Sequence, residues 1–280
     1  MTNMRHVQRH GWRPDTPDRR DHIFSAPEHV SAAPLPTSVD LRPAMPPLYD
    51  QGELGSCTGN AIAGAYEFDL IKQKVTDFAP SRLFIYYNER VMEGTVSQDA
   101  GAEIRDGIKS IGQQGVCTEK TWPYNIKKFA SKPTKKAYTE ALGHKALTYA
   151  RVPQTLKDMK GCLAAGYPIV LGFSVYESFE SQQVADTGIV QMPDATERLV
   201  GGHAVVVVGY DDATQRWIVR NSWGSSWGIG GCFTIPYTYF TDPNLASDLW
   251  TIRVVAGTTR PSMPTSFFDK LMEIIHNLFG

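Results

Sequence analysis

The stretch Gln51-Gly-Glu-Leu-Gly-Ser-Cys57-Thr-Gly-Asn60 is the most informative part of this 280-residue chain. It places a thiol directly before a run of mainly apolar residues with helical spacing, from Cys57 to about Lys74. Gly59 and Gly64 are poor helix formers, so they indicate a helix packed closely among other elements. A helix N-terminus stabilises negative charge, so this position favours the thiolate form of Cys57.

Two polar residues in the second half of the chain, each next to an apolar strand pattern, complete a possible set of catalytic groups. His203 opens the run His-Ala-Val-Val-Val-Val, and it is the only one of the seven histidines that enters a long apolar strand. Asn221 follows the strand pattern Arg216-Trp-Ile-Val-Arg220. A thiol, an imidazole and an amide in this order suit nucleophilic catalysis, with His203 carrying the proton and Asn221 orienting the ring. The Gln51 side chain, with the Cys57 backbone N–H, would donate to an oxyanion.

Each of these residues also has a purely structural interpretation. A free cysteine is most often a buried apolar side chain. His203 could be a hydrogen-bonded histidine at a strand end, and the glycine-rich loop after Asn221 could simply be packed by Trp223 and Trp227. The ordered set of four residues favours the chemical interpretation over the structural ones.

The expected elements divide the chain into a helical half and a strand half. We expect helices at 57–74, 80–90, 102–111 and 154–166, and strands at 167–175, 203–208, 216–220, 232–235 and 250–255. This order predicts an α+β protein of two lobes, with Cys57 on one lobe and His203 on the other. A cleft between two such lobes is a natural active site.

The bulk composition excludes several classes of protein. The chain is 42% hydrophobic and 20% charged, with a formal net charge of -1 and only short basic runs. We therefore expect no nucleic-acid partner, and no apolar stretch is long enough to span a bilayer. The N-terminus lacks the apolar core of a secretory signal, which leaves a cytoplasmic location or export by a signal-less route. The spacings of Cys57, Cys117, Cys162 and Cys232 predict neither a disulfide framework nor a metal site, and we expect no cofactor.

The two ends of the chain differ from its centre. Residues 1–36 are polar and rich in proline, and we interpret them as an arm that docks through the apolar side chains of Trp12, Ile23 and Phe24; the alternative is a disordered leader. We expect this arm to lie near the cleft and restrain access. We expect residues 258–280 to form a linker and a short amphipathic helix, for which docking to protein is favoured over a membrane.

Taken together, these segments resemble the papain-like cysteine peptidases over about Leu35 to Val255. Leu35-Pro-Thr-Ser-Val-Asp40-Leu-Arg resembles the start of the family's mature domain, which we place at 37–257. His203-Ala-Val and Asn221-Ser-Trp-Gly-Ser-Ser-Trp-Gly match two further family boxes. Thr58-Gly-Asn and the Trp12-Arg-Pro-Asp arm are similar to the bacterial, xylellain-like branch. Two departures are Leu54, at the position of a disulfide cysteine, and Thr58, at the position of a tryptophan.

The resemblance implies a fold, an activity and contacts with substrate. The fold is a helical N-terminal lobe and an antiparallel, β-barrel-like C-terminal lobe with the active-site cleft between them. The activity is that of an endopeptidase that acts on peptides or proteins through an acyl-enzyme. Substrate contacts are expected at Gly101, Gly202, Trp223 and Asp248, where Asp248 would favour a basic side chain if it points inward. A papain-fold scaffold without turnover, and a transferase or ligase in which an amine replaces water, are the alternatives.

Overall fold

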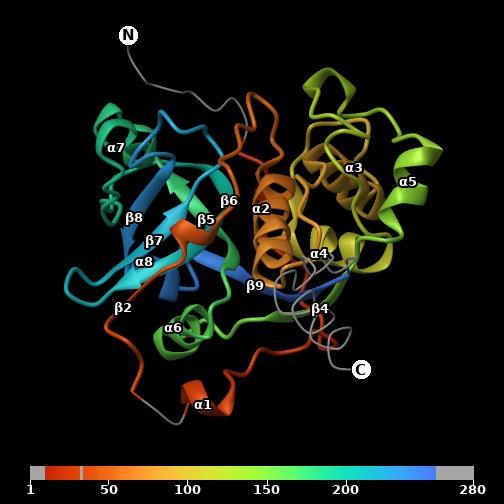
Figure 1. The fold of residues 1–280 in the computed structure, drawn as a ribbon. Coiled ribbons are helices and arrows are strands. Elements are labelled where there is room, and N and C mark those ends of the chain that lie inside the picture. The colour runs from red at the N-terminus through yellow and green to blue at the C-terminus, as the bar shows by residue number, and fades with distance from the viewer. Residues whose placement is uncertain (1–9, 32–33, 257–280) are drawn as a thin grey trace, which may run out of the picture.

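One central helix separates the helical part of the molecule from its sheet. The structure, a computed structural model, describes residues 10–31 and 34–256. Helix α2 (Cys57–Lys72) stands between the sheet and a group of helices (Figure 1). On the helical side lie α3 (Arg82–Glu93), α4 (Ile104–Gln113) and α5 (Lys135–Ala141). On the sheet side lie α6 (Leu156–Ala164), α7 (Gln182–Thr187) and α8 (Tyr237–Thr241). The two lobes expected from the sequence are therefore present.

The sheet has seven strands, six of them in one antiparallel path. Their order is β4 (Ala146–Arg151), β9 (Ala246–Val255), β5 (Ile169–Tyr176), β6 (Leu199–Asp211), β7 (Arg216–Arg220) and β8 (Cys232–Pro236), and β2 (Ser38–Asp40) also pairs with β6. Strands β4 and β2 have no counterpart among the strands expected from the sequence. β4 reads Ala-Leu-Thr-Tyr-Ala-Arg, with a mixture of buried and exposed positions that gives a weak strand pattern.

Strand β6 has an unbroken apolar sequence because both of its faces are covered. Ala204, Val206 and Val208 belong to a core shared with α2 and the helical lobe. Val205 and Val207 belong to a second core beneath the sheet. Successive side chains of a strand point to opposite faces, so a strand between two cores is apolar at every position. This placement sets Ala204 on the face toward α2 and its neighbour His203 on the other.

Helix α2 is enclosed on nearly all sides, as its glycines predict. Its residues from Cys57 to Leu70 are all buried. A Cβ added at Gly59 would lie 2.8 Å from the carbonyl oxygen of Arg82, so only glycine lets α3 approach this closely. The neighbouring helix α3 is fixed at its start by Ser81, whose Oγ accepts a hydrogen bond from the Phe84 N–H.

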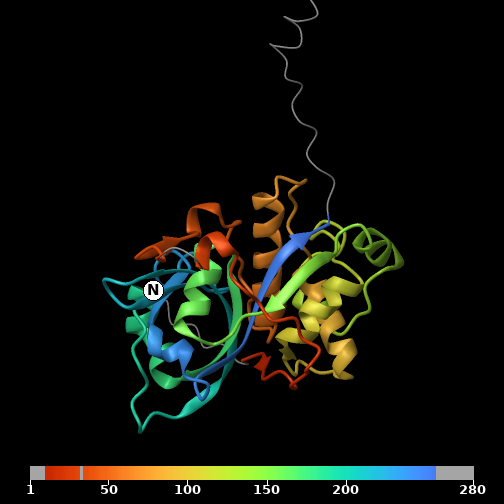
Figure 2. The same cartoon turned by 90° about the horizontal axis from the view of Figure 1, so that it is seen from below.

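The described part of the N-terminal arm is docked across both lobes. Strand β1 (Trp12–Arg13) pairs in parallel with β3 (Ala102–Glu103) of the helical lobe, and the arm then continues past β4 to the short helix α1 (Glu28–Ser31) (Figure 2). Trp12 and Phe24 are buried. Ile23 is not the anchor that the sequence suggested, because 63% of its surface is exposed. Side chains alternate along an extended segment, so burial of Phe24 directs Ile23 outward.

Candidate active site

The fold brings Cys57 and His203 together from different lobes. Cys57 is the first residue of α2 and His203 lies within β6, which packs on that helix. The Cys57 sulfur is close to the backbone N–H groups of Ala204, Thr58 and Gly11. Both side chains have no exposed surface. The thiol therefore lies beside the strand that carries the histidine, at a helix N-terminus.

Asn221 fixes the orientation of the histidine ring. The ring nitrogen Nε2 of His203 lies 2.8 Å from the Asn221 side-chain oxygen. The indole of Trp223 stacks on the imidazole, with ring centres 5.0 Å apart and planes 30° apart, and it shields this hydrogen bond from water. Nε2 is thus the donor, and the other ring nitrogen, Nδ1, has no hydrogen-bond partner among the described residues. The ring can accept a proton at Nδ1 while Asn221 holds it in place.

Both polar atoms of the Gln51 side chain form hydrogen bonds, and the residue is fully buried. Its Nε2 donates to the Leu54 carbonyl over 3.0 Å, and its Oε1 accepts from Ser222 Oγ over 2.6 Å. The Ser222 backbone N–H donates to Asn221 Oδ1 over 2.8 Å. One serine therefore links the amide that orients His203 to the candidate oxyanion donor. Ser222 was not among the residues predicted from the sequence, although its place directly after Asn221 was the available signal.

A buried carboxyl group lies behind Cys57. Thr58 Oγ1 donates to Glu89 Oε1 over 2.5 Å, and Glu89 has no exposed surface. Burial raises the Glu89 pKa to about 8, so the group is mostly neutral at pH 7. The departure from tryptophan at position 58 thus introduces a polar pair between α2 and α3. Glu89 was not singled out in the sequence, because a lone glutamate in a helix carries no distinctive signal.

The N-terminal arm covers this pair of side chains. The Gly11 N–H is close to the Cys57 sulfur, and the imidazole of His10 lies edge-on to that of His203, with ring centres 6.4 Å apart. There is no room for a side chain at Gly11, because a Cβ added there would lie 1.7 Å from the Gly55 carbonyl oxygen. Its backbone thus runs in direct contact with the loop before Cys57.

Burial of the two side chains determines the protonation state of the pair. Burial raises the pKa of the Cys57 thiol to about 12, against the smaller lowering effect of the backbone N–H groups. Burial also lowers the pKa of His203 to about 3, although the hydrogen bond with Asn221 opposes this. Both shifts favour the uncharged form, because a buried charge loses its hydration. Under the arm, the pair is a neutral thiol and a neutral imidazole.

The four residues expected to contact substrate fall into two groups. Gly101, Gly202 and Asp248 all touch the arm: a Cβ at Gly101 would lie 2.3 Å from the Gly11 oxygen, a Cβ at Gly202 would lie 2.6 Å from the Trp12 ring, and Asp248 accepts a hydrogen bond from the Trp12 indole over 3.2 Å. Trp223 is instead buried against His203, Phe179 and Trp227.

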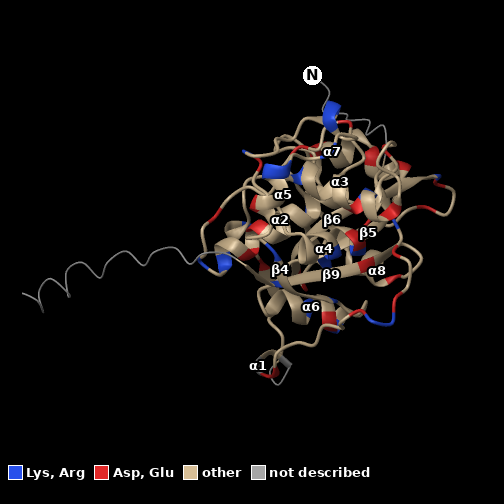
Figure 3. Cartoon of the chain, turned by 90° about the vertical axis from the view of Figure 1, so that its right-hand side faces the viewer, with Lys and Arg blue, Asp and Glu red and all other residues tan. Residues whose placement is uncertain are grey.

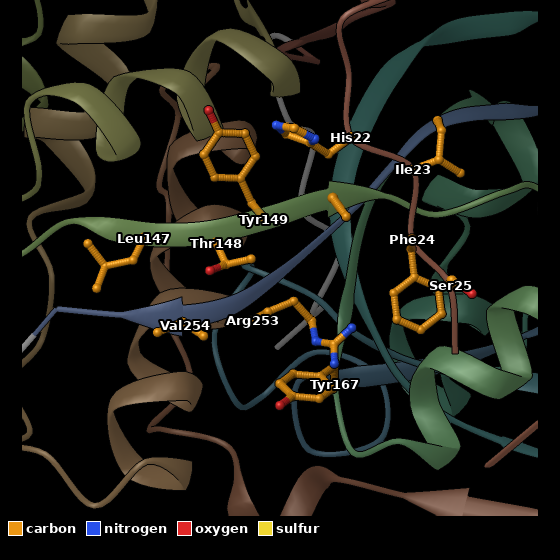
Figure 4. Close-up of a pocket in the computed structure, with 11 residues that line it drawn as sticks. His22, Ile23, Phe24, Ser25, Leu147, Thr148, Tyr149, Tyr167, Arg253 and Val254 are labelled. Atoms are coloured by element: carbon orange, nitrogen blue, oxygen red, sulfur yellow. The ribbon is translucent and has the colours of Figure 1, made fainter. Parts of the chain in front are cut away.

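Other features of the surface lie away from this site. A separate hollow beside β4 and β9 is lined by arm residues 22–25, and in it Arg253 lies over the Tyr167 ring (Figure 4). Positive and negative residues are interspersed on the face shown in Figure 3.

Within residues 10–31 and 34–256, no helix has the length and apolar character needed to cross a membrane. The same residues contain no group of three His, Cys, Asp or Glu placed to hold a metal ion.

Comparisons with known proteins agree with this arrangement. Residues 35–247 match the model of the family described as papain family cysteine protease. An uncharacterised peptidase C1-like protein of Acanthamoeba polyphaga mimivirus is 52% identical over 215 residues, which cover 74% of this chain and 69% of that protein. A cathepsin B-like protein of Giardia intestinalis is 30% identical over 243 residues, covering 78% and 74%.

A solved structure extends the likeness to the fold. The crystal structure of xylellain, a cysteine protease from Xylella fastidiosa, superimposes with a TM-score of 0.80 at 42% identity and covers 90% of this chain and 96% of that one. The expected papain-like two-lobe fold and the likeness to a bacterial protease are confirmed. The chain belongs to the papain family of cysteine proteases and is a cysteine endopeptidase.

Proposed function

We propose that this protease cleaves peptide bonds with Cys57 as the nucleophile and His203 as the acid and base. The observation that carries the assignment is the hydrogen bond of 2.8 Å between His203 Nε2 and Asn221. It commits one ring nitrogen to orientation and leaves Nδ1 for the proton of the thiol. Asn221 is a positioning residue, and Gln51 with the Cys57 backbone N–H donates to the oxyanion.

The reaction then follows from these positions. His203 takes the thiol proton, and the Cys57 sulfur attacks the carbonyl carbon of the scissile bond, which sends the electron pair onto oxygen. Gln51 donates to that oxyanion. His203 returns the proton to the leaving amine as the carbon–nitrogen bond breaks, which gives a thioester. His203 next activates water, which hydrolyses the thioester and frees Cys57.

Replacement and labelling of Cys57 test the assignment. Cys57→Ala should abolish cleavage of a peptide library read by mass spectrometry, whereas Cys162→Ala, the control, should keep it. Once the arm is displaced, iodoacetamide should label Cys57 before Cys117, Cys162 or Cys232. Faster labelling of any of those three would contradict the assignment. A peptide product carrying an added amine in place of water would instead favour the transferase alternative.

The arm, residues 1–36, is proposed to restrain the enzyme in the full-length chain. The contacts of His10 and Gly11 with the catalytic pair support this, as does the burial that keeps the pair uncharged. A tethered segment has a high effective concentration, so modest contacts compete well with substrate. Displacing the arm would let water reach the thiol and imidazole, and a thiolate–imidazolium pair would then form.

The enzyme's partners are peptide or protein substrates. Residues 258–280, which lie outside the described residues, are proposed to be a docking element for protein, on the basis of their apolar stripe in the sequence. Truncation after Gly257 should leave peptide cleavage intact and abolish only that docking. A large loss of peptide cleavage would place the segment in catalysis instead.

A further inference from the structure

The N-terminal arm places the side chain of Trp12 against the sheet, in a close-fitting slot near the catalytic pair. The Trp12 indole lies on two glycines of adjacent strands, Gly172 of β5 and Gly202 of β6. A Cβ at Gly172 would lie 1.9 Å from the indole carbon Cε2, and a Cβ at Gly202 would lie 2.6 Å from Cε3. Only glycine at these two positions leaves room for the ring.

The register of the sheet explains why this slot is flat and shallow. Gly172 pairs with Ala204, and Ser174 pairs with Gly202. Paired residues point to the same face of a sheet, so these four small residues form one patch on the α2 side. Large residues here would fill the space above the strands. The patch is therefore shaped for a broad planar side chain.

A buried carboxylate lies at the edge of the slot. The register of β5 and β9 shifts between Val170, which pairs with Trp250, and Gly172, which pairs with Ser247. Asp248 stands at this bulge with a φ of 60°, a left-handed conformation that aspartate tolerates better than most residues. A bulge redirects a side chain, and here Asp248 Oδ2 lies 3.2 Å from the Trp12 indole nitrogen.

The charge of Asp248 is already balanced within the protein. Arg151 donates to Asp248 Oδ1 over 2.9 Å; the Asp248 side chain is buried and that of Arg151 is partly buried. A lysine or arginine side chain entering the slot would bring a second cation close to Arg151, and the repulsion would offset its attraction to the carboxylate. The other oxygen, Oδ2, accepts from two neutral N–H groups of the arm, the Trp12 indole over 3.2 Å and the Asp15 backbone over 2.8 Å. A neutral N–H donor of a substrate could replace them without that cost. This reverses the expectation that Asp248 selects a basic side chain.

We infer that this slot, formed by Gly172, Gly202 and Asp248, selects a tryptophan side chain of the peptide substrate, and that Trp12 of the arm occupies it as an internal stand-in. The inference rests on the proposed function and names its substrate class. Phenylalanine fits the glycine patch but offers no N–H to Asp248. Leucine and valine lack the planar shape, so they fill the slot poorly.

The test uses the full-length chain carrying Trp12→Ala and Phe24→Ala, which removes the side chain in the slot and both buried aromatic anchors of the arm, so that a peptide can compete with the arm for the site. In a peptide library, one position near the scissile bond should be enriched in tryptophan about fivefold or more over leucine, arginine and lysine. Adding Gly172→Ala or Gly202→Ala should remove that enrichment, and Asp248→Asn should shrink the preference for tryptophan over phenylalanine. Gly143→Ala, at an exposed glycine where an added Cβ would make only an ordinary contact of 3.6 Å with the Glu140 carbonyl oxygen, is the matched control and should leave the profile unchanged.

A binding assay separates failure of the slot from failure of the enzyme. Acetyl-Gly-Trp-Arg-amide should slow iodoacetamide labelling of Cys57 in the chain carrying Trp12→Ala and Phe24→Ala more than acetyl-Gly-Leu-Arg-amide does. If no peptide is cleaved but the tryptophan peptide protects Cys57, the slot stands and the proposed function is wrong. Cleavage with an aliphatic or basic preference, or equal protection by both peptides, would overturn the slot. Melting temperatures of the glycine variants show that each has folded.

Discussion

At the scale of single residues, catalysis depends on side chains whose positions are set by other side chains. Ser222 illustrates this, since its backbone N–H contacts Asn221 and its hydroxyl contacts Gln51 over 2.6 Å. Neither group reacts, yet both must point in one direction when charge develops on the substrate. Preorganised donors are effective because they need no rearrangement during the reaction.

Removing these positioning groups should slow the enzyme by graded amounts. Gln51→Ala removes the proposed oxyanion donor, and loss of such a donor typically costs about 3 kcal/mol or roughly a hundredfold in kcat. Asn221→Ala should cost about one to a few orders of magnitude, because Asn221 makes and breaks no bond. Wild-type rates for either variant would reject its role.

Ser222→Ala leaves the Gln51 amide in place but removes its hydroxyl partner. The expected loss is smaller, about tenfold, in line with one hydrogen bond. The measurement is kcat and KM with a fixed peptide, beside the exposed control Ser131→Ala. An unchanged kcat would show that Leu54 alone is sufficient to orient the amide.

At the scale of elements, the arm is attached to the body by a cluster of buried charges. Asp15 accepts hydrogen bonds from the Arg105 backbone N–H over 3.0 Å and from the Trp250 indole over 2.8 Å. The charged groups around it are Asp248, Arg105, Arg151 and Asp21. Burial, and then the Asp248 carboxylate, raises the Asp15 pKa to about 7. Docking of the arm is thereby coupled to proton uptake.

The sign of this coupling predicts a tighter arm in acid. An acid whose pKa is higher when docked binds its proton more strongly in that state, so protonation favours docking. Docking should weaken as the pH rises from Asp15's ordinary pKa, near 4, to about 7, and then stay level. We expect arm opening to increase by about tenfold or more between pH 5 and pH 8.

Hydrogen exchange of the backbone amides of Gly11, Trp12, Arg13 and Asp15 measures this opening, after correction for the intrinsic effect of pH. Asp15→Asn is the matched control, because it keeps the shape of the side chain without the titration, and its opening should not vary with pH over this range. Parallel pH dependence in both chains would assign the effect to another group, such as His10 with Glu180.

At the scale of the whole molecule, the arm contributes both cover and stability. Trp12 and Phe24 are buried in the two separate cores, so the arm links the lobes as well as covering Cys57. Deleting residues 1–34 should therefore raise peptide turnover and lower the melting temperature, by about 5 °C or more for the loss of two aromatic anchors. Unchanged turnover with a lower melting temperature would make the arm a structural strap only.

The four cysteines give a second test at this scale. All four are free and buried. Denatured, non-reduced protein should therefore yield four titratable thiols, whereas the folded full-length chain should react slowly at every one. Finding two thiols after denaturation would reveal a disulfide and contradict the structure.

The sequence by itself singled out the candidate catalytic groups and determined the class of fold. Cys57 at a helix start, His203 in an apolar strand and Asn221 after another strand were each identified from local pattern, because helix and strand periodicity depend on neighbouring residues. Because these patterns are local, they did not predict strand β4 or the orientation of Ile23. Strand β4 has a weak pattern and is held by pairing with β9, and Ile23 was assigned as an anchor because its apolar character does not show which way it points.

Only the tertiary structure decided what surrounds these groups. The seat of Trp12 on Gly172 and Gly202 joins residues more than 150 positions apart in the chain, and the contact between Asp15 and Asp248 spans 233 positions. Such contacts are set by the packing of the lobes and by a shift in sheet register, neither of which leaves a local pattern. The direction in which Asp248 points, and the charge of Arg151 beside it, are the grounds on which we propose a neutral N–H donor in place of the basic side chain that the aspartate alone suggested.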